Sequence, residues 1–145
     1  MSRRVLILED DDLRIKHFMR NLVGCHIMVV KEAIHAINYL NNETWDLLLL
    51  DHDLGGEQMV DYSNKNTGSE VARWLSENPE KKPPAILLHS FNPVGRLNMK
   101  KLLPESVVAS GGIWNTLTTS MIEEKSFNEA ARNTAEIQNR SLRLI

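Results

Sequence analysis

The chain has a single cysteine, Cys25, among its 145 residues. One cysteine cannot form a disulfide within the chain, so internal disulfides cannot support the fold. A lone thiol in an apolar neighbourhood is normally a packing group, and we expect Cys25 to have no catalytic role. This cysteine usage is typical of a protein from the reducing cytoplasm.

Long hydrophobic runs and blocks of one charge are also missing. No apolar segment approaches the length of a membrane span, and residues 1–4 lead into a short apolar segment rather than the hydrophobic region of a signal peptide. The net charge is −2 without a long basic block, which argues against binding to a membrane or to extended DNA. A nucleotide or an RNA end held in a local pocket remains compatible with this charge. We therefore expect a cytoplasmic protein without a membrane partner.

What the sequence does contain is a regular alternation of short apolar segments and amphipathic ones. The predicted strands cover residues 5–8, 26–30, 47–50, 85–88 and 107–109. Between them, apolar residues recur at helical spacing, as in Ile15, Phe18 and Leu22. The third strand is four consecutive leucines, which is typical of a central parallel strand covered on both faces. The pattern predicts an α/β fold with a doubly wound, five-stranded parallel sheet of order 2-1-3-4-5.

Residues typical of helix starts predict where the domain ends and an additional helix begins. Residues 1–122 are predicted to form the α/β domain, and residues 123–145 a C-terminal helical extension that begins at a capping-box spacing, Ser126 to Glu129. The apolar stripe of this extra helix is thin, so it could pack across the domain edge, mediate a homodimer or fray. Inside the domain, the segment 67–70 has the spacing of a second capping box, and Asn92 is the expected cap of a helix that begins at Pro93.

Polar residues follow nearly every strand of the predicted sheet. Ligands of such a sheet bind outside the carboxyl ends of strands 1 and 3, where the strand order reverses. The residues at these ends are Glu9, Asp10 and Asp11 after the first strand, Asp51, His52 and Asp53 after the third, His89, Ser90 and Asn92 after the fourth, and Ser110, Gly111 and Gly112 after the fifth. We expect the carboxylates of Asp10 and Asp51 to lie within a few ångströms of each other, with His52 or His89 in the same crevice.

This acidic cluster predicts a divalent cation. A single acid could be a solvated loop residue, but converging carboxylates repel one another unless a cation or shared protons compensate. Their hard oxygens suit Mg²⁺ or Mn²⁺, and the nearby imidazoles would also admit a transition metal. The candidate ligands are Glu9, Asp10, Asp51 and Asp53.

The imidazoles and arginines of the same edge have two interpretations each. His52 and His89 each follow a strand into the crevice, which favours acid–base work or metal ligation over packing. Arg14 and Arg96 could each bind a phosphate or only pair with local acids.

The Gly111-Gly112 turn before a helix would offer amides to an anion. The polar loop 52–66 is long enough to be suspected of a function, and Gly95 indicates a close backbone approach.

The segment from Val5 to Asp11, followed by a leucine strand that ends at Asp51, resembles a two-component receiver domain over roughly residues 3 to 122. The resemblance implies that Asp51 is the phospho-accepting aspartate and that Glu9 and Asp10 hold Mg²⁺. Two positions depart from the receiver pattern. His89 stands where receivers end strand 4 with Ser or Thr, and no lysine ends strand 5. Both residues normally contact the phosphoryl group, so the resemblance to a signalling receiver is incomplete.

Four motifs resemble a narrower family, the cyclic-phosphate-processing receiver domains. They are Asp11-Asp12-Leu13-Arg14, Leu50-Asp51-His52-Asp53-Leu54-Gly55, Thr67-Gly68 and His89-Ser90-Phe91-Asn92-Pro93-Val94-Gly95-Arg96-Leu97-Asn98-Met99. This resemblance implies that the chain acts on a cyclic phosphate of a nucleotide or RNA end, and that its site contains Asp51, His52, Asp53, His89, Ser90 and Asn92.

Three functions are compatible with these residues. The first is metal-assisted hydrolysis of a cyclic phosphate, with Asp51, His52, His89 and Ser90 as catalytic residues. In this hypothesis the phosphate ligands are Arg14, Asn92, Arg96, Asn98, Gly111 and Gly112. The second is a receiver that is phosphorylated on Asp51. The third is a module that binds and sequesters a nucleotide without turnover.

Overall fold

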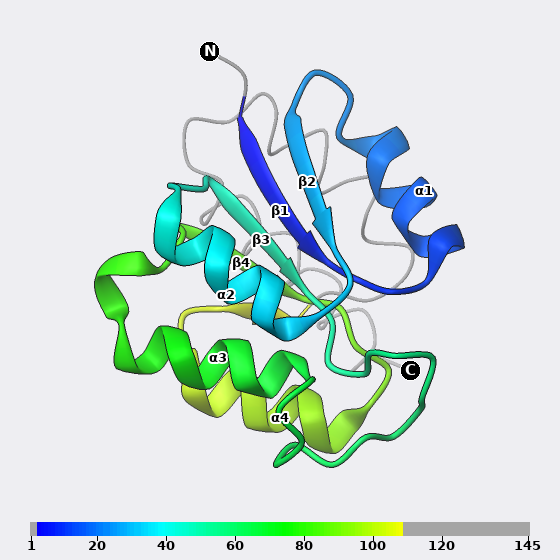
Figure 1. The fold of residues 1–145 in the computed structure, drawn as a ribbon, viewed down its shortest axis with the longest axis vertical. Helices are drawn as coiled ribbons and strands as arrows, with labels where there is room; N and C mark the ends of the chain where they lie inside the picture. Colours follow the sequence, from blue (N-terminus) through cyan, green and yellow to red (C-terminus); the bar gives the residue numbers. More distant parts are fainter. Residues whose placement is uncertain (1–2, 109–145) are drawn as a thin grey trace, which may run out of the picture.

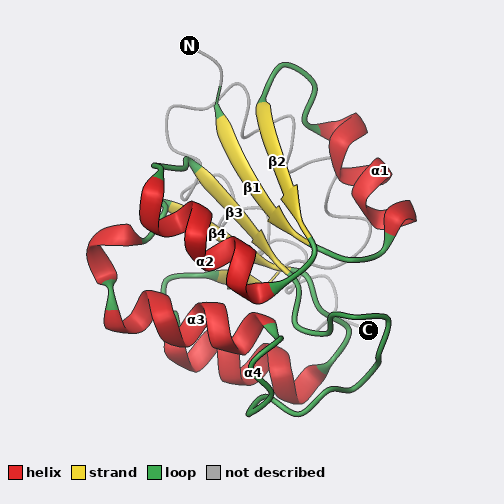
Figure 2. Ribbon diagram, in the orientation of Figure 1, coloured by secondary structure: helices red, strands yellow, loops and turns green. Residues whose placement is uncertain are grey.

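The computed structural model describes residues 3–108. Within them, strands and helices alternate in the predicted order (Figures 1 and 2). The elements are β1 (Arg4–Leu8), α1 (Asp12–Asn21), β2 (His26–Val30), α2 (Ala33–Asn42), β3 (Leu47–Leu50), α3 (Gly68–Glu77), the 3₁₀ turn η1 (Pro79–Lys81), β4 (Ala85–Leu88), α4 (Pro93–Leu102) and β5 (Val107–Val108).

All five strands are parallel, in the order β2-β1-β3-β4-β5, which confirms the predicted doubly wound sheet. The register aligns the strand ends, because Leu8 pairs with Leu50 and Leu50 pairs with Leu88. The next residue of each strand continues the ladder. The amide of Asp51 donates to the carbonyl of Leu8 at 3.1 Å, and that of His89 donates to the carbonyl of Leu50 at 3.1 Å. The sheet thus delivers the polar residues to one edge, side by side.

The core has two layers because side chains alternate between the faces of each strand. Val5, Ile7, Leu47 and Leu49 face α1, while Leu6, Leu8, Leu48 and Leu50 face α2, α3 and α4. Figure 1 shows this division, with α1 on one side of the sheet and the other three helices on the opposite side. These strand leucines are fully buried, as a central parallel strand requires. No helix in the described part of the chain is long and apolar enough to span a membrane.

Two helix-start predictions have different outcomes. Asn92 caps α4 as expected, since its side-chain oxygen accepts from the amide of Gly95 at 3.0 Å. The capping box at Thr67 does not form, although α3 begins at Gly68 as predicted. The Thr67 hydroxyl donates instead to the carbonyl of Asn64, because Thr67 is buried where it pairs with Asp53 in an antiparallel bridge. The predicted residues Ser110, Gly111 and Gly112, and the helical extension 123–145, lie outside the described residues.

Candidate functional site

Three buried side chains converge where β1, β3 and β4 end. Glu9, Asp51 and His89 each offer a ligand atom, and these atoms lie within 4.8 Å of one another. The imidazole Nε2 of His89 lies 3.3 Å from Oε1 of Glu9, and the ring packs edge-on against Phe18. All three polar residues are buried, so their charges cannot be balanced by water. We call Glu9, Asp51 and His89 the acidic triad.

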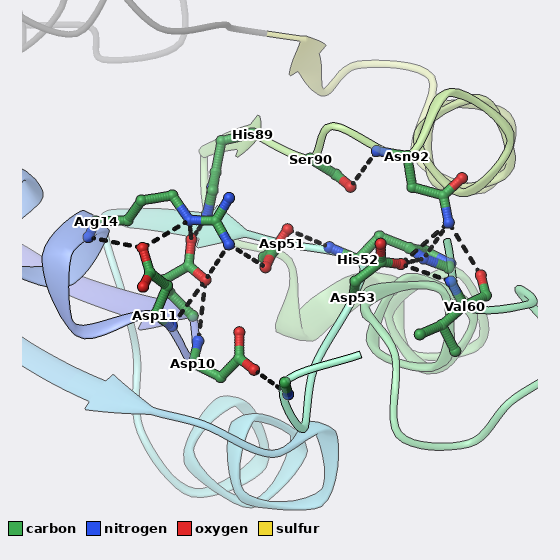
Figure 3. Close-up of polar contacts among 12 residues, drawn as sticks. Asp10, Asp11, Arg14, Asp51, His52, Asp53, Val60, His89, Ser90 and Asn92 are labelled. Atoms are coloured by element: carbon green, nitrogen blue, oxygen red, sulfur yellow. Dashed lines mark hydrogen bonds and ion pairs between the residues drawn. The ribbon is translucent and has the colours of Figure 1, made fainter. Parts of the chain in front are cut away.

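Arg14 supplies the positive charge that faces the acidic triad. It extends from the first turns of α1 toward Asp11 and Asp51 (Figure 3), and its Nε lies 2.9 Å from Oε1 of Glu9. Its Nη2 lies 3.8 Å from Oδ2 of Asp51, and Nε also approaches Asp11, the N-cap of α1, at 3.5 Å. One guanidinium therefore contacts the carboxylates of both β1 and β3. It occupies the space next to them where a bound cation would balance the same charges.

The two buried carboxyls have opposite pKa shifts. Burial raises the pKa of Asp51, and the negative charge of Glu9 together with a hydrogen bond between the two carboxyls raises it further, to about 8, against the opposing effects of Arg14 and the His52 amide. Burial also acts to raise the pKa of Glu9, but the hydrogen bond and charge of His89, the Asp51 hydrogen bond and the charge of Arg14 prevail, so that pKa is lowered. At neutral pH the pair therefore carries one negative charge, on Glu9, and one proton, on Asp51.

A cavity of about 570 Å³ lies next to Asp51 of the triad. Its lining comprises Asp10, Asp11, Arg14, Asp51, Asp53, Gly56, Glu57, Gln58, Met59, Ser90 and Phe91. The volume is in the range of pockets that hold small ligands. Asp10 and Asp51 both line it. Neither His52 nor His89 is among the described residues that line it.

A second polar group holds one wall of this cavity. The carboxylate of Asp53 accepts four hydrogen bonds, from His52 Nδ1 at 2.9 Å, Asn92 Nδ2 at 3.0 Å, and the amides of Met59 and Val60 at 2.7 and 3.2 Å. Burial raises the pKa of Asp53, but these hydrogen bonds, that of Asn92 first, outweigh it and lower the pKa. Figure 3 shows His52, Asp53 and Asn92 converging beside Val60. We call His52, Asp53 and Asn92 the loop anchor, because they fix the segment 53–60 against α4.

His52 is fully buried within the loop anchor. A carboxylate only accepts, so Nδ1 donates its proton to Asp53, while Nε2 lies 2.9 Å from the hydroxyl of Ser69. The backbone of Gly95 covers the ring so closely that a Cβ at this position would lie 2.4 Å from His52 Cγ. The close approach expected at Gly95 is therefore present, and its partner is an imidazole.

The structure divides the predicted site residues between these two groups. Of the four predicted metal ligands, Glu9 and Asp51 converge, and His89 joins them. Asp10 and Asp53, the other two predicted ligands, line the cavity but are not part of the acidic triad. The Asp10 carboxylate accepts from the amide of Gly56 at 2.7 Å, and Asp53 is held in the loop anchor.

The predicted phosphate ligands are also divided. Arg14 lines the cavity, as does Ser90, which is predicted to be catalytic. Asn92 is buried in the loop anchor. The guanidinium of Arg96 donates to the carbonyl of Ser90 at 3.0 Å, and neither Arg96 nor Asn98, two residues apart on α4, is among the described residues that line the cavity.

Sequence reasoning did not single out the cavity wall formed by Gly56, Glu57, Gln58 and Met59, nor Phe91 at its rim. The length of the loop 52–66 was the only signal for the wall. Gly55 and Gly56 have φ of 75° and 77°, which allows the tight turn that returns the loop to Asp10. Phe91 belongs to the motif that includes Ser90 and Asn92, but the motif did not indicate that its side chain is exposed.

Comparison with known proteins adds a family and a fold. The cyclic-phosphate processing receiver domain family matches residues 5–105. No curated protein sequence matches the chain. A signal receiver domain from Vibrio parahaemolyticus is similar in structure, with 18% identity, coverage of 94% of this chain and 98% of that one, and a TM-score of 0.64. A CheY-like receiver domain protein from Methanospirillum hungatei has 15% identity, coverage of 92% and 99%, and a TM-score of 0.65.

A third similar structure is the Mn²⁺-bound form of the response regulator Rcp1. It has 13% identity, coverage of 94% of this chain and 92% of that one, and a TM-score of 0.58. At these identities the three structures establish the fold of the receiver domains.

Proposed function

Because this chain belongs to the family of cyclic-phosphate processing receiver domains, we propose that it hydrolyses a cyclic phosphate of a nucleotide or RNA end. The observation that carries this proposal is the lining of the cavity, in which Asp51 of the acidic triad lies together with Arg14 and Ser90. Such a site combines a place for a divalent cation with donors for phosphate oxygens.

The acidic triad suits a divalent cation such as Mg²⁺ or Mn²⁺. Glu9 Oε1 and Asp51 Oδ2 are buried oxygens that face the guanidinium of Arg14, at 2.9 and 3.8 Å. Glu9, Asp51 and His89 would hold the cation, which agrees with Mn²⁺ binding in the structural neighbour Rcp1. A divalent cation bound here would stabilise the negative charge that develops on the phosphoryl oxygens during hydrolysis.

The chain's own residues would bind the phosphate and handle protons. In ring opening, a bond forms between the water oxygen and phosphorus, one ring P–O bond breaks, and the released oxygen receives a proton. Ser90 Oγ accepts from the amide of Asn92 at 3.0 Å, so its own proton can be donated to a phosphate oxygen. Once a cation balances the charges of Glu9 and Asp51, Arg14 can neutralise a second phosphate oxygen. Of the two protons of the attacking water, one stays on the phosphate and the other passes to the released oxygen, so the step balances without a proton from the residues that would hold the cation.

The test is to incubate the full chain with 2′,3′-cyclic and 3′,5′-cyclic nucleotides, with Mg²⁺, Mn²⁺ or EDTA, and to record product masses. We expect a gain of one water molecule on at least one substrate, with a cation present and not with EDTA. Nucleotides that return unchanged under every condition contradict the proposed hydrolysis. A rise in melting temperature with unchanged nucleotide would instead identify a sequestering module.

Phosphorylation of Asp51 is the second candidate. It is favoured by the place of Asp51 at the end of β3, in the lining of the cavity. Incubation with acetyl phosphate and Mg²⁺ would then add one phosphoryl group to Asp51. Substitution His89→Thr restores the residue type that receivers use at this position, so it should raise phosphorylation in a receiver and abolish hydrolysis in an enzyme.

A further inference from the structure

Two large apolar side chains line the same polar cavity and are both exposed. Phe91 is 67% exposed and Met59 is 64% exposed, and most of the remaining lining is charged or polar. They come from different elements, since Met59 lies in the loop after β3 and Phe91 follows β4. The cavity therefore offers apolar surface in addition to its acidic lining residues.

The backbone at Met59 has a strained conformation that hydrogen bonds of the loop maintain. Met59 has φ of 53°, in the left-handed region that residues other than glycine seldom adopt. Its amide donates to Oδ2 of Asp53 at 2.7 Å, and the amide of Val60 donates to Oδ1. Strain of this kind persists only when surrounding bonds over-determine it, and it concentrates at ligand sites. The loop anchor thus holds a long apolar side chain at the cavity.

Phe91 lies next to the groups assigned to the phosphate. Its neighbour Ser90 lines the cavity, and the guanidinium carbon of Arg14 lies 5.6 Å from the centroid of the Phe91 ring. Arg14 in turn approaches Asp51, which lines the same cavity, at 3.8 Å. A ligand whose phosphate reaches Arg14 therefore has its remaining part within reach of an exposed aromatic ring.

We propose that Phe91 and Met59 form a platform for a nucleobase, so that the cavity takes a nucleoside phosphate in preference to a base-free sugar phosphate. This inference rests on the proposed function for the position of the phosphate and extends it to the base. Stacking on an aromatic ring accepts any base, because every base has a π face. The amide of Gln58, which also lines the cavity, provides a donor and an acceptor for the edge of the base.

The test compares adenosine 2′,3′-cyclic phosphate with ribose 2′,3′-cyclic phosphate, which has no base, in the presence of Mn²⁺. Affinity is measured by calorimetry, and KM where turnover occurs. Phe91→Ala should weaken the adenosine compound roughly tenfold or more and leave the ribose compound unchanged, since stacking on an aromatic side chain contributes at this level. Phe91→Trp should retain or improve binding. Leu97→Ala is the matched control, because Leu97 is exposed on α4 and is not among the cavity-lining residues.

The outcomes separate this inference from the proposed function. Equal affinity for the two compounds, or equal loss of both in Phe91→Ala, contradicts the base platform even if hydrolysis is observed. Selective loss of the adenosine compound without turnover supports the platform and contradicts hydrolysis. Absence of binding by either compound contradicts both, and would leave Phe91 and Met59 as a surface for another kind of partner.

Discussion

The imidazole of His52 cannot change its position without breaking several contacts. Its two nitrogens meet Asp53 and Ser69 at 2.9 Å, and the backbone of Gly95 covers the ring. The ring therefore holds the end of β3, the start of α3 and the first turn of α4 together. Its contribution is to the shape of the site.

Substitution Gly95→Ala tests this contact. The added Cβ would lie 2.4 Å from His52 Cγ, a distance that real side chains do not tolerate, and the bonded ring cannot retreat. We expect the free energy of unfolding to fall by about 1–3 kcal/mol or more, as for other overpacked positions. Urea denaturation measures this change. Val94→Ala, at an exposed neighbour, should have little effect, and a neutral Gly95→Ala would show that the His52 ring is free to move.

The guanidinium of Arg14 and a bound cation would balance the same carboxylates. Substitution Arg14→Gln removes the positive charge next to Glu9 and Asp51, so Mn²⁺ should bind more tightly. The metal-free protein should melt at a lower temperature because Glu9 loses its counter-charge. Calorimetric titration with Mn²⁺ and thermal melting measure the two effects. Arg20→Gln, at the exposed end of α1, is the control, and weaker Mn²⁺ binding by Arg14→Gln would contradict competition.

At the scale of elements, the loop between β3 and α3 is shaped from both ends. Asp10 holds the amide of Gly56, and Asp53 holds the amides of Met59 and Val60. Asn92 adds a bond from its side-chain amide to the carbonyl of Val60 at 3.0 Å. Loop and α4 are thus one structural unit, although more than 30 residues separate them in sequence.

Two substitutions of Asn92 separate its roles. Asn92→Ala removes both the cap of α4 and the bonds to the loop, whereas Asn92→Ser can keep a cap. Both should accelerate amide hydrogen exchange at Met59 and Val60, and only Asn92→Ala should lose the further contribution of the cap, about 1 kcal/mol. Asn38→Ala, on the exposed face of α2, is the control. Unchanged exchange in both Asn92 variants would mean that Asp53 alone holds the loop.

The elements themselves were predictable because their signals are local. Four consecutive leucines, helical spacing and the Asn92-Pro93 cap each depend on neighbouring residues only, and the strand order then located the site. The fate of the polar residues was less predictable. His52 and His89 both follow buried strands, but one is bonded in the loop anchor and the other joins the acidic triad. That difference depends on Ser69 and Gly95, which approach His52 only after folding.

For the whole molecule, the acidic triad predicts an unusual dependence of stability on pH. The pKa of Asp51 is raised from its unfolded value of 3.8 to about 8, so the folded state binds the extra proton between these limits. Its contribution to stability is fully present below pH 4 and is lost progressively as the pH rises to about 8. The lowered pKa of Glu9 changes the free energy of unfolding with pH only below about pH 4.5.

The free energy of unfolding, measured across this range without metal, should therefore fall more steeply with pH for the native chain than for Asp51→Asn. Asparagine keeps the shape of the side chain without a titrating proton, so the difference between the two curves isolates Asp51. Asp12→Asn, at an exposed position of α1, should follow the native curve. Parallel curves for the native chain and Asp51→Asn would show that Asp51 is ionised throughout.

The most direct test of cyclic-phosphate hydrolysis at the acidic triad is the turnover rate of Asp51→Asn. Hydrolysis of a 2′,3′-cyclic nucleotide with Mn²⁺ would be followed by phosphorus NMR for the native chain, Asp51→Asn and the control Asp12→Asn. Asp51 is expected both to hold the cation and to line the cavity, so Asp51→Asn should remain folded and lose turnover, while Asp12→Asn keeps it. Undiminished hydrolysis by folded Asp51→Asn would contradict the assignment of this site.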